Sequence, residues 1–385
     1  MEVGKLLEKN QKKMFVYLFA LALILMAVYS VDVKKKVQLK NPYYYTILVV
    51  LILITGLQWR LGGDNLSYEI YYKDIPTIDR LRIDQLGIGV KYQPLWYIFC
   101  AILKSITPSF VFFHIVHSII INTVVLSFFR RYTKYVFTAI LLYYLSFNYL
   151  MFNIELQRES LAVMCFLLGL KYLQRETIAG YLKYYLFAIV AFFFHTSALI
   201  TFIIPIVLVL LKRAKNIYTS VIILGALLAL FIYLSESVMF SFVGEGISEN
   251  IFDQAEHYFD HDKNFSNILI NGFFNVIAPL IVIYISFASK AKKDVFLYLG
   301  MLLVVVYIGN AYFTGFSRMV NYLIFPFYVS LVNVFSGTKK YGLLKIMCIT
   351  VMIIATAYHM TRPIDFRRHG DLYYNMYIPY QSILD

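Results

Sequence analysis

Long apolar runs separated by short polar segments recur along the whole chain. A helical run of about 20 residues matches the hydrocarbon thickness of a bilayer. The runs lack the alternation of apolar and polar residues that is typical of a membrane β-strand, so helices are the expected spanning elements. Runs of roughly this size lie near 14–31, 43–57, 109–129, 134–152, 156–173, 217–235, 269–288, 295–313, 316–335 and 341–358.

One longer apolar stretch, residues 184–211, is interrupted by the polar triplet 195–197. Its flanks are both basic, with Lys183 before it and Lys212 after it. A single crossing would place these lysines on opposite sides of the membrane, so we expect a broken hairpin with His195 at its outer apex. Each arm holds only about 14 core residues, or about 21 Å of helix. We therefore expect the apex to lie below the outer surface, in a protein-lined pocket.

A further apolar segment, Gln93–Thr107, is short and carries Lys104. If it were a full span, the loop 58–93 would lie in the cytoplasm, and cytoplasmic and outer loops would no longer alternate along the chain. We therefore expect a short interfacial or re-entrant helix on the outer side. The pattern as a whole predicts an all-α polytopic membrane protein with about 12 transmembrane helices and both termini outside.

Basic residues gather in alternate connections, which the positive-inside rule assigns to the cytoplasm. Residues 235–268 hold seven acidic side chains against one lysine, Lys263, which suits an outer loop. The lysines of the N-terminal tail fit this topology least well. We treat 1–385 as one integral membrane domain, with an outer loop and interfacial helix at 58–108, an acidic outer loop at 235–268 and an outer C-terminal tail at 359–385.

Composition agrees with a membrane protein, because the 385 residues are 60% hydrophobic and only 15% charged. The net charge of +13 lies in short connections that topology explains, so no nucleic acid is expected as a partner. Cys100, Cys165 and Cys348 lie singly in apolar segments and predict neither disulfides nor a zinc site. We expect no cleaved signal peptide, no cofactor and no metal, since neither a cleavage site nor a nucleotide or metal motif is present.

Several polar side chains in apolar context fall at one predicted level, the outer leaflet boundary. Arg158 and Arg318 each open a helix, where the positive end of the helix dipole is unfavourable for a cation. An anion shared between them would account for this placement, and pyrophosphate is the obvious candidate. The alternative is that they are arginines anchored at the interface. The other members of the set are Arg60, Asp64, Gln157 and His195.

Histidine and tyrosine residues have competing interpretations. His195 could be a functional group or a hydrogen-bonded turn residue. His114 and His117 superficially suggest a metal pair, but no acid accompanies them locally, so packing and interhelical hydrogen bonds are favoured. Many tyrosines fit aromatic belts, while Tyr68 in an outer loop could stack on a sugar ring.

Five segments, in order along the chain, carry recognisable motifs: Arg60–Tyr68, Asn153–Ala162, Phe194–Leu199, Arg318–Tyr322 and Ile378–Ile383. They resemble, in turn, the R-x-G-x-D-x-x-x-Y stretch, the R-Q helix start, the F-H-x-S-A-L turn, the late R-x-x-x-Y helix and the closing I-P-Y segment of the EpsG family of Wzy-like bacterial exopolysaccharide polymerases.

The resemblance implies a GT-C-like membrane glycosyltransferase in the bacterial cytoplasmic (inner) membrane. It would polymerise oligosaccharide repeat units carried on undecaprenyl pyrophosphate at the outer face, with membrane lipid around the site. A chain-length regulator and a flippase are candidate partners. An O-antigen-ligase-like transferase would use the same leaving group. A lipid-linked oligosaccharide flippase or transporter is the alternative of another class, but it predicts mid-membrane charges and an internal repeat, which we do not find.

The resemblance and the residues together suggest a donor site. Arg158 and Arg318, with Arg60 as a third candidate, would hold the donor pyrophosphate and stabilise the leaving charge. Gln157 would position groups. The order Gln157-Arg158 departs from the family, in which arginine often comes first, so the roles of these two side chains stay open.

The acceptor hydroxyl needs a general base. His195 is the first candidate, because an imidazole titrates near neutral pH. Asp64 and Glu155 are the alternatives. Tyr322 would position groups, and Tyr68 is a further candidate for substrate binding.

Overall fold

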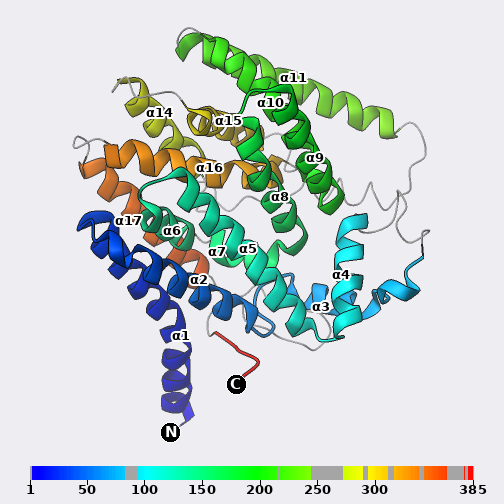
Figure 1. Cartoon of the computed structure of the whole chain (residues 1–385), viewed down its shortest axis with the longest axis vertical. Helices are drawn as coiled ribbons and strands as arrows, with labels where there is room; N and C mark the ends of the chain where they lie inside the picture. Colours follow the sequence, from blue (N-terminus) through cyan, green and yellow to red (C-terminus); the bar gives the residue numbers. More distant parts are fainter. Residues whose placement is uncertain are drawn as a thin grey trace. The chain divides into compact units, whose positions relative to one another are not determined.

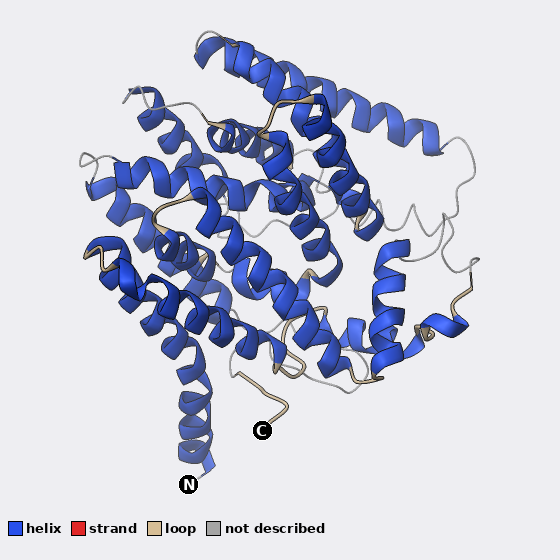
Figure 2. Ribbon diagram, viewed as in Figure 1, coloured by secondary structure: helices blue, strands red, loops and turns tan. Residues whose placement is uncertain are grey.

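The structure, a computed structural model, describes residues 2–82, 93–146, 148–214, 217–243, 272–288, 294–310, 316–337, 342–361, 377 and 380–384 (Figure 1). Every regular element in these ranges is helical (Figure 2). The extended pairing found there is an isolated antiparallel bridge between Gln58 and Ser382. The predicted all-helical class is therefore confirmed.

Five helices in the described part of the chain are long and apolar enough to cross a membrane, and a bent pair, Val136–Leu145 with Asn148–Glu155, adds a sixth candidate. The chain is thus a membrane protein. Shorter apolar helices, such as Ile178–Phe194 and Val295–Gly309, fall below the length of a full span. The count of about 12 spans and the GT-C-like architecture stay predictions. The five long candidates are Phe15–Val33, Val37–Gly56, Phe110–Tyr132, Thr196–Arg213 and Phe316–Ser336.

The chain divides into two compact units, which we describe one at a time. Unit 1 contains residues 1–171, 182–196 and 349–385. It begins with α1 and a π-helical turn, Val28–Val33, and its short α7 continues into a second π-helical turn, Met151–Glu155. The helices that lie wholly or mainly in unit 1 are α1 (Glu2–Ala27), α2 (Lys40–Gly56), α3 (Asn65–Asp74), α4 (Pro94–Ile106), α5 (Phe110–Tyr132), α6 (Val136–Leu145), α7 (Asn148–Leu150), α8 (Gln157–Leu173) and α9 (Ile178–Phe194).

Helices α2 and α5 of unit 1 approach each other closely where α2 ends. A β-carbon at Gly56 would lie only 3.2 Å from the Cα atom of Ile115. Next to it, Thr55 Oγ1 and Ser118 Oγ form a hydrogen bond of 2.6 Å. Small and hydroxyl-bearing residues allow this kind of contact between membrane helices.

Asn153 ties the π-helical turn before α8 to this helix pair. Its Nδ2 donates to the Tyr143 hydroxyl at 3.0 Å and to the Tyr149 carbonyl at 2.8 Å. Its Oδ1 accepts from Asn122 Nδ2 at 2.9 Å and from Thr55 Oγ1 at 3.3 Å. All four hydrogen bonds lie in the interior, so they hold the start of α8 in a defined place.

Two basic connections of unit 1 meet at the same end of its helices. The backbone N–H and the hydroxyl of Thr138 donate to Asp32 Oδ2 at 2.7 and 2.8 Å. Lys35 Nζ stands 4.1 Å from the centre of the Tyr135 ring. The connection after α1 and the connection before α6 therefore lie together, as their common assignment to one side requires.

Unit 2 contains residues 172–181 and 197–348, with α15 packed along α16. Asp294 caps α15, because its side chain accepts a hydrogen bond from the Leu297 N–H at 2.9 Å. Helix α17 begins in unit 2 and ends in unit 1. The elements are α10 (Leu199–Arg213), α11 (Ile217–Val243), α14 (Ala278–Ala288), α15 (Val295–Gly309), α16 (Phe316–Gly337) and α17 (Gly342–Thr361).

Some predicted boundaries hold and others move. The break expected at His195 is present, since α9 ends at Phe194 and α10 begins at Leu199. The short helix expected after Gln93 is α4. Helix α11, however, continues to Val243 instead of ending at 235, so it takes up the first part of the predicted acidic loop; residues 244–268 of that loop lie outside the described part.

Candidate functional site

The turn that follows α2 has a backbone that only particular residues allow. Arg60 and Gly62 have φ values of +49° and +83°, in the left-handed region that favours glycine. A β-carbon at Gly62 would lie 2.7 Å from Ile154 Cγ2 and 3.2 Å from Glu155 Cγ. Glycine is therefore required where this turn passes the end of the π-helical turn before α8.

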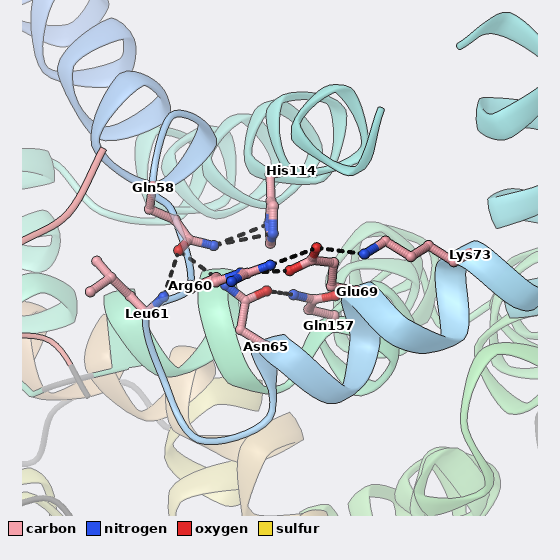
Figure 3. Close-up of polar contacts among 8 residues, drawn as sticks. All are labelled: Gln58, Arg60, Leu61, Asn65, Glu69, Lys73, His114 and Gln157. Atoms are coloured by element: carbon pink, nitrogen blue, oxygen red, sulfur yellow. Dashed lines mark hydrogen bonds and ion pairs between the residues drawn. The ribbon is translucent and has the colours of Figure 1, made fainter. Parts of the chain in front are cut away.

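Gln58 organises the inside of this turn (Figure 3). Its Oε1 accepts from the Leu61 N–H at 3.1 Å and from Asn65 Nδ2 at 3.0 Å. Its Nε2 lies 3.3 and 3.2 Å from the two ring nitrogens of His114 on α5. Because Gln58 is fully buried, these contacts join the turn, α3 and α5 without help from solvent.

Gln157, the first residue of α8, extends the same network. Its Nε2 donates to Asn65 Oδ1 at 3.3 Å and to the Ile154 carbonyl at 3.1 Å. Its Oε1 is buried and has no hydrogen-bond partner within the described residues. The start of α8 is thus attached directly to the turn after α2.

His114 and His117 both form hydrogen bonds between segments, as their sequence context favours. His114 contacts Gln58. His117 Nε2 lies 3.0 Å from the Gln157 carbonyl and 2.9 Å from Ser160 Oγ, which links α5 to α8. In the described part of the chain, no group of three or more His, Cys, Asp or Glu residues is arranged to hold a metal ion.

Arg60 is part of an ion-pair cluster on the same turn (Figure 3). Its Nε and one terminal nitrogen donate to the two oxygens of Glu69, at 3.1 and 3.4 Å, and Lys73 Nζ donates to Glu69 at 3.0 Å. Burial raises the pKa of Glu69, but the hydrogen bonds and charges of Arg60 and Lys73 outweigh it and lower the pKa below its ordinary value. The cluster itself, two cations around one carboxylate, carries one net positive charge.

Arg158, the second residue of α8, faces a different element from Gln157. One terminal nitrogen of Arg158 donates to Gln93 Oε1 at 3.5 Å, and Gln93 is the N-cap residue of α4. The half-buried guanidinium therefore lies where the N-terminal ends of α4 and α8 come together. Such ends present backbone N–H groups that have no partner within their own helix.

Glu155 and Asp64 lie around one buried tyrosine. Glu155 Oε1 accepts hydrogen bonds from the Tyr377 hydroxyl and, at 3.3 Å, from the Gly63 N–H. Burial, then the charge of Glu155 and, less strongly, that of Asp64 raise the pKa of Tyr377 well above its ordinary value. The hydroxyl thus stays protonated and acts as a donor to Glu155.

Helix α4 also contacts the segment that carries His195. The Phe194 ring packs edge-on against Phe99 of α4, with their centres 6.4 Å apart. His195 comes next, half-buried, and its backbone N–H donates to the Ala191 carbonyl at 3.0 Å. Within unit 1, α4 therefore contacts the segments of both Arg158 and His195.

Arg318 and Tyr322 belong to unit 2. Arg318 is the third residue of α16 and half-buried, so it lies in the first turn as predicted. The Tyr322 hydroxyl lies 3.1 Å from Ser197 Oγ, and this contact joins two of the motif segments. A convergence of Arg318 with Arg158 and His195 stays a prediction.

The structure adds residues that sequence reasoning did not select. Gln58 and Asn65 lie at the two ends of the turn and form a hydrogen bond with each other, and Gln93 accepts a hydrogen bond from Arg158. Glu69 had one usable signal, its spacing of four residues from Lys73. No signal in the sequence distinguishes Tyr377 from the other tyrosines, of which the chain has 34 in total. Tyr68 packs edge-on against Trp96, with ring centres 5.7 Å apart.

Comparison with known proteins bears on this arrangement. A family model described as the EpsG family matches residues 41–382, which include four of the five motif segments and all but the last residue of the fifth, Ile378–Ile383. Searches of curated proteins and of solved structures find no match.

Proposed function

Because the chain belongs to the EpsG family, a Wzy-like polymerase family, we propose that it polymerises oligosaccharide repeat units carried on undecaprenyl pyrophosphate. The growing glycan would be transferred to a lipid-linked repeat unit at the outer face of the bacterial cytoplasmic membrane. Nucleotide sugars are not supplied on that side, so the donor must arrive activated on a lipid. A site reached by lipid must lie among membrane helices.

The observation that carries this proposal is the position of Arg158 at two helix N-termini. A guanidinium beside the N-terminal ends of α4 and α8 adds its charge to the positive ends of two helix dipoles. A pyrophosphate there would accept hydrogen bonds from the guanidinium and from backbone N–H groups of the first turns. Arg318, in the first turn of α16, is the second proposed ligand.

Arg60 has a different place in this scheme. Its two hydrogen bonds to Glu69 hold it on the protein, so we assign it the role of stabilising the turn. The cluster keeps the Lys73 ammonium exposed, where it would meet an anionic lipid headgroup.

The proposed reaction forms one bond and breaks another at the anomeric carbon of the donor. The acceptor hydroxyl oxygen bonds to that carbon, the carbon–oxygen bond to pyrophosphate breaks, and undecaprenyl pyrophosphate leaves with the electron pair. The hydroxyl proton passes to a base, for which His195 is proposed and Asp64 or Glu155 are the alternatives. Arginine contacts stabilise the charge that develops on the leaving group.

The test is reconstitution of the full chain in lipid vesicles with a pyrophosphate-linked repeat unit, followed by gel separation of the products. The wild type should build a ladder of lipid-linked chains. Arg158→Ala should lower the rate about 100-fold, the usual effect of removing one donor that stabilises a transition state. A single transfer to another acceptor would instead indicate a ligase.

Arg130→Ala is the matched control. Arg130 lies in the last turn of α5 and donates to Asn41 Oδ1 at 3.1 Å, at the end of unit 1 where the basic connections meet. Its removal should leave the ladder intact. A complete ladder from Arg158→Ala would rule out the proposed pyrophosphate contact.

A further inference from the structure

The described part of the C-terminal segment, Tyr377 and residues 380–384, pairs with the backbone that leads into the candidate site. The Trp59 N–H donates to the Gln381 carbonyl at 2.9 Å, and the Ile383 N–H donates to the Leu57 carbonyl at 3.0 Å. These two bonds flank the antiparallel bridge between Gln58 and Ser382. The backbone immediately before Arg60 is thus held by the far end of the chain.

The same segment satisfies carbonyl groups at the end of α2. The Tyr380 hydroxyl donates to the Ile54 carbonyl at 2.9 Å, and Ser382 Oγ donates to the Leu57 carbonyl at 3.1 Å. A helix end leaves such carbonyls without partners in the helix itself. The Tyr17 hydroxyl of α1 in turn donates to the Tyr377 carbonyl at 3.0 Å. The segment is therefore an integral part of unit 1.

Tyr377 brings this segment to a carboxylate of the candidate site. Its side chain is only 1% exposed, and its hydroxyl donates to the same Glu155 oxygen that the Gly63 N–H reaches. Glu155 is thereby held from both the turn after α2 and the C-terminal segment. Two donors on one carboxylate oxygen restrict the side-chain rotamer, and so they set the direction of the second oxygen.

We propose that the C-terminal segment is a structural component of the transfer site and that Tyr377 is a positioning residue, which orients the Glu155 carboxylate toward the acceptor hydroxyl. This inference rests on the proposed function and takes its alternative in which Glu155, instead of His195, accepts the proton of the acceptor hydroxyl. Tyr377 acts only through Glu155 and does not touch the substrate.

Tyr377→Phe is the direct test, because it removes the hydroxyl and keeps the ring. In the vesicle assay with the pyrophosphate-linked repeat unit, kcat should fall about tenfold or more, while KM changes little, since misplacing a catalytic group by about 1 Å can cost about 100-fold. Loss of a donor also disfavours an ionised carboxylate. The acidic limb of the pH–rate profile should therefore move to higher pH, a shift that a purely structural tyrosine would not cause.

Tyr144→Phe is the matched control. Tyr144 is also buried, and its hydroxyl donates to the Tyr17 carbonyl at 2.8 Å, away from Glu155. Its kinetics and pH profile should match those of the wild type. If Tyr377→Phe behaves like Tyr144→Phe while the wild type builds a ladder, the positioning role is wrong and the polymerase proposal stands.

A second measurement needs no substrate. Thermal unfolding of the purified chain is compared for Tyr377→Phe, Glu155→Ala and the double variant. If Tyr377 holds Glu155, the Tm shift of the double variant should be smaller than the sum of the two single shifts. If the wild type extends no chain, the proposed function fails. Additive Tm shifts, which are measured without substrate, would overturn the contact between Tyr377 and Glu155 in either case.

Discussion

Gln157 and Arg158 are neighbours in the chain, but their side chains enter different surroundings. Gln157 is fully buried and joins Asn65, whereas Arg158 is half-buried and reaches Gln93 at the start of α4. Successive residues of a helix point about 100° apart, so an adjacent pair cannot share one face. The reversed order relative to the family motif is thus compatible with a buried amide that positions and an arginine that faces α4.

Gly62 is the residue at which the turn is least tolerant of change. Gly62→Ala would place a β-carbon 2.7 Å from Ile154 Cγ2 in a left-handed backbone conformation. We expect a loss of unfolding free energy of about 1–3 kcal/mol, seen as a lower Tm in a detergent or lipid scan. Activity should fall with it, because the turn carries Arg60 and contacts Glu155.

Gly225→Ala provides the comparison for that prediction. Gly225 lies inside α11, and a β-carbon there would have no neighbour within 4 Å among the described residues. Alanine is favoured over glycine within a helix by about 1 kcal/mol, so Tm should stay equal or rise. A Gly62→Ala variant as stable as Gly225→Ala would show that the turn relaxes easily.

At the scale of elements, α3 is attached to the turn by charge and α4 connects two parts of the candidate site. Glu69 on α3 accepts hydrogen bonds from both Arg60 and Lys73. Helix α4 accepts a hydrogen bond from Arg158 through its N-cap residue, Gln93, and its Phe99 packs against Phe194. Through these contacts the two short helices hold side chains at the turn after α2, at the start of α8 and at the end of α9.

The attachment of α3 should weaken in acid. The pKa of Glu69 is lowered in the folded protein, so the stability contributed by its ionised form is fully present above the ordinary value of 4.5 and is lost as pH falls through the lowered pKa. Glu69→Gln should reduce the unfolding free energy at pH 7 by about 1 kcal/mol, because both cations are partly exposed.

The measurement is the Tm difference between the wild type and Glu69→Gln as a function of pH. The difference should be constant near neutral pH and shrink below 4.5. Asp74→Asn is a suitable control, because Asp74 is an exposed carboxylate at the last position of the same helix, and exposed substitutions change stability little. A difference that does not change with pH would contradict the ionic attachment.

At the scale of the whole molecule, the order of the helices implies a topology that can be tested directly. The basic connection that contains Lys36 is predicted to be cytoplasmic, and the loop that contains Asp79 is predicted to be outside. Both side chains are exposed. A membrane-impermeant thiol reagent applied to intact cells should label Asp79→Cys but not Lys36→Cys, and the wild-type chain controls for the native cysteines. Equal labelling of both would overturn the topology.

Hydrophobic length and charge by themselves determined the helical class, the membrane environment, the break at His195 and the helix starts at Arg158 and Arg318. These properties are local, because a run of apolar residues or an interruption within it acts on neighbours in the chain. The motif segments likewise carried the family, which the match over residues 41–382 confirms.

Only the tertiary structure decided which polar groups meet. The pairing of Arg60 with Glu69 and the contact of Gln157 with Asn65 depend on how α3 and α8 approach the turn. Tyr377 reaches Glu155 across 222 positions of sequence. Side-chain partners over such separations are set by helix packing and by the need to satisfy buried polar groups, and no local pattern records either of them.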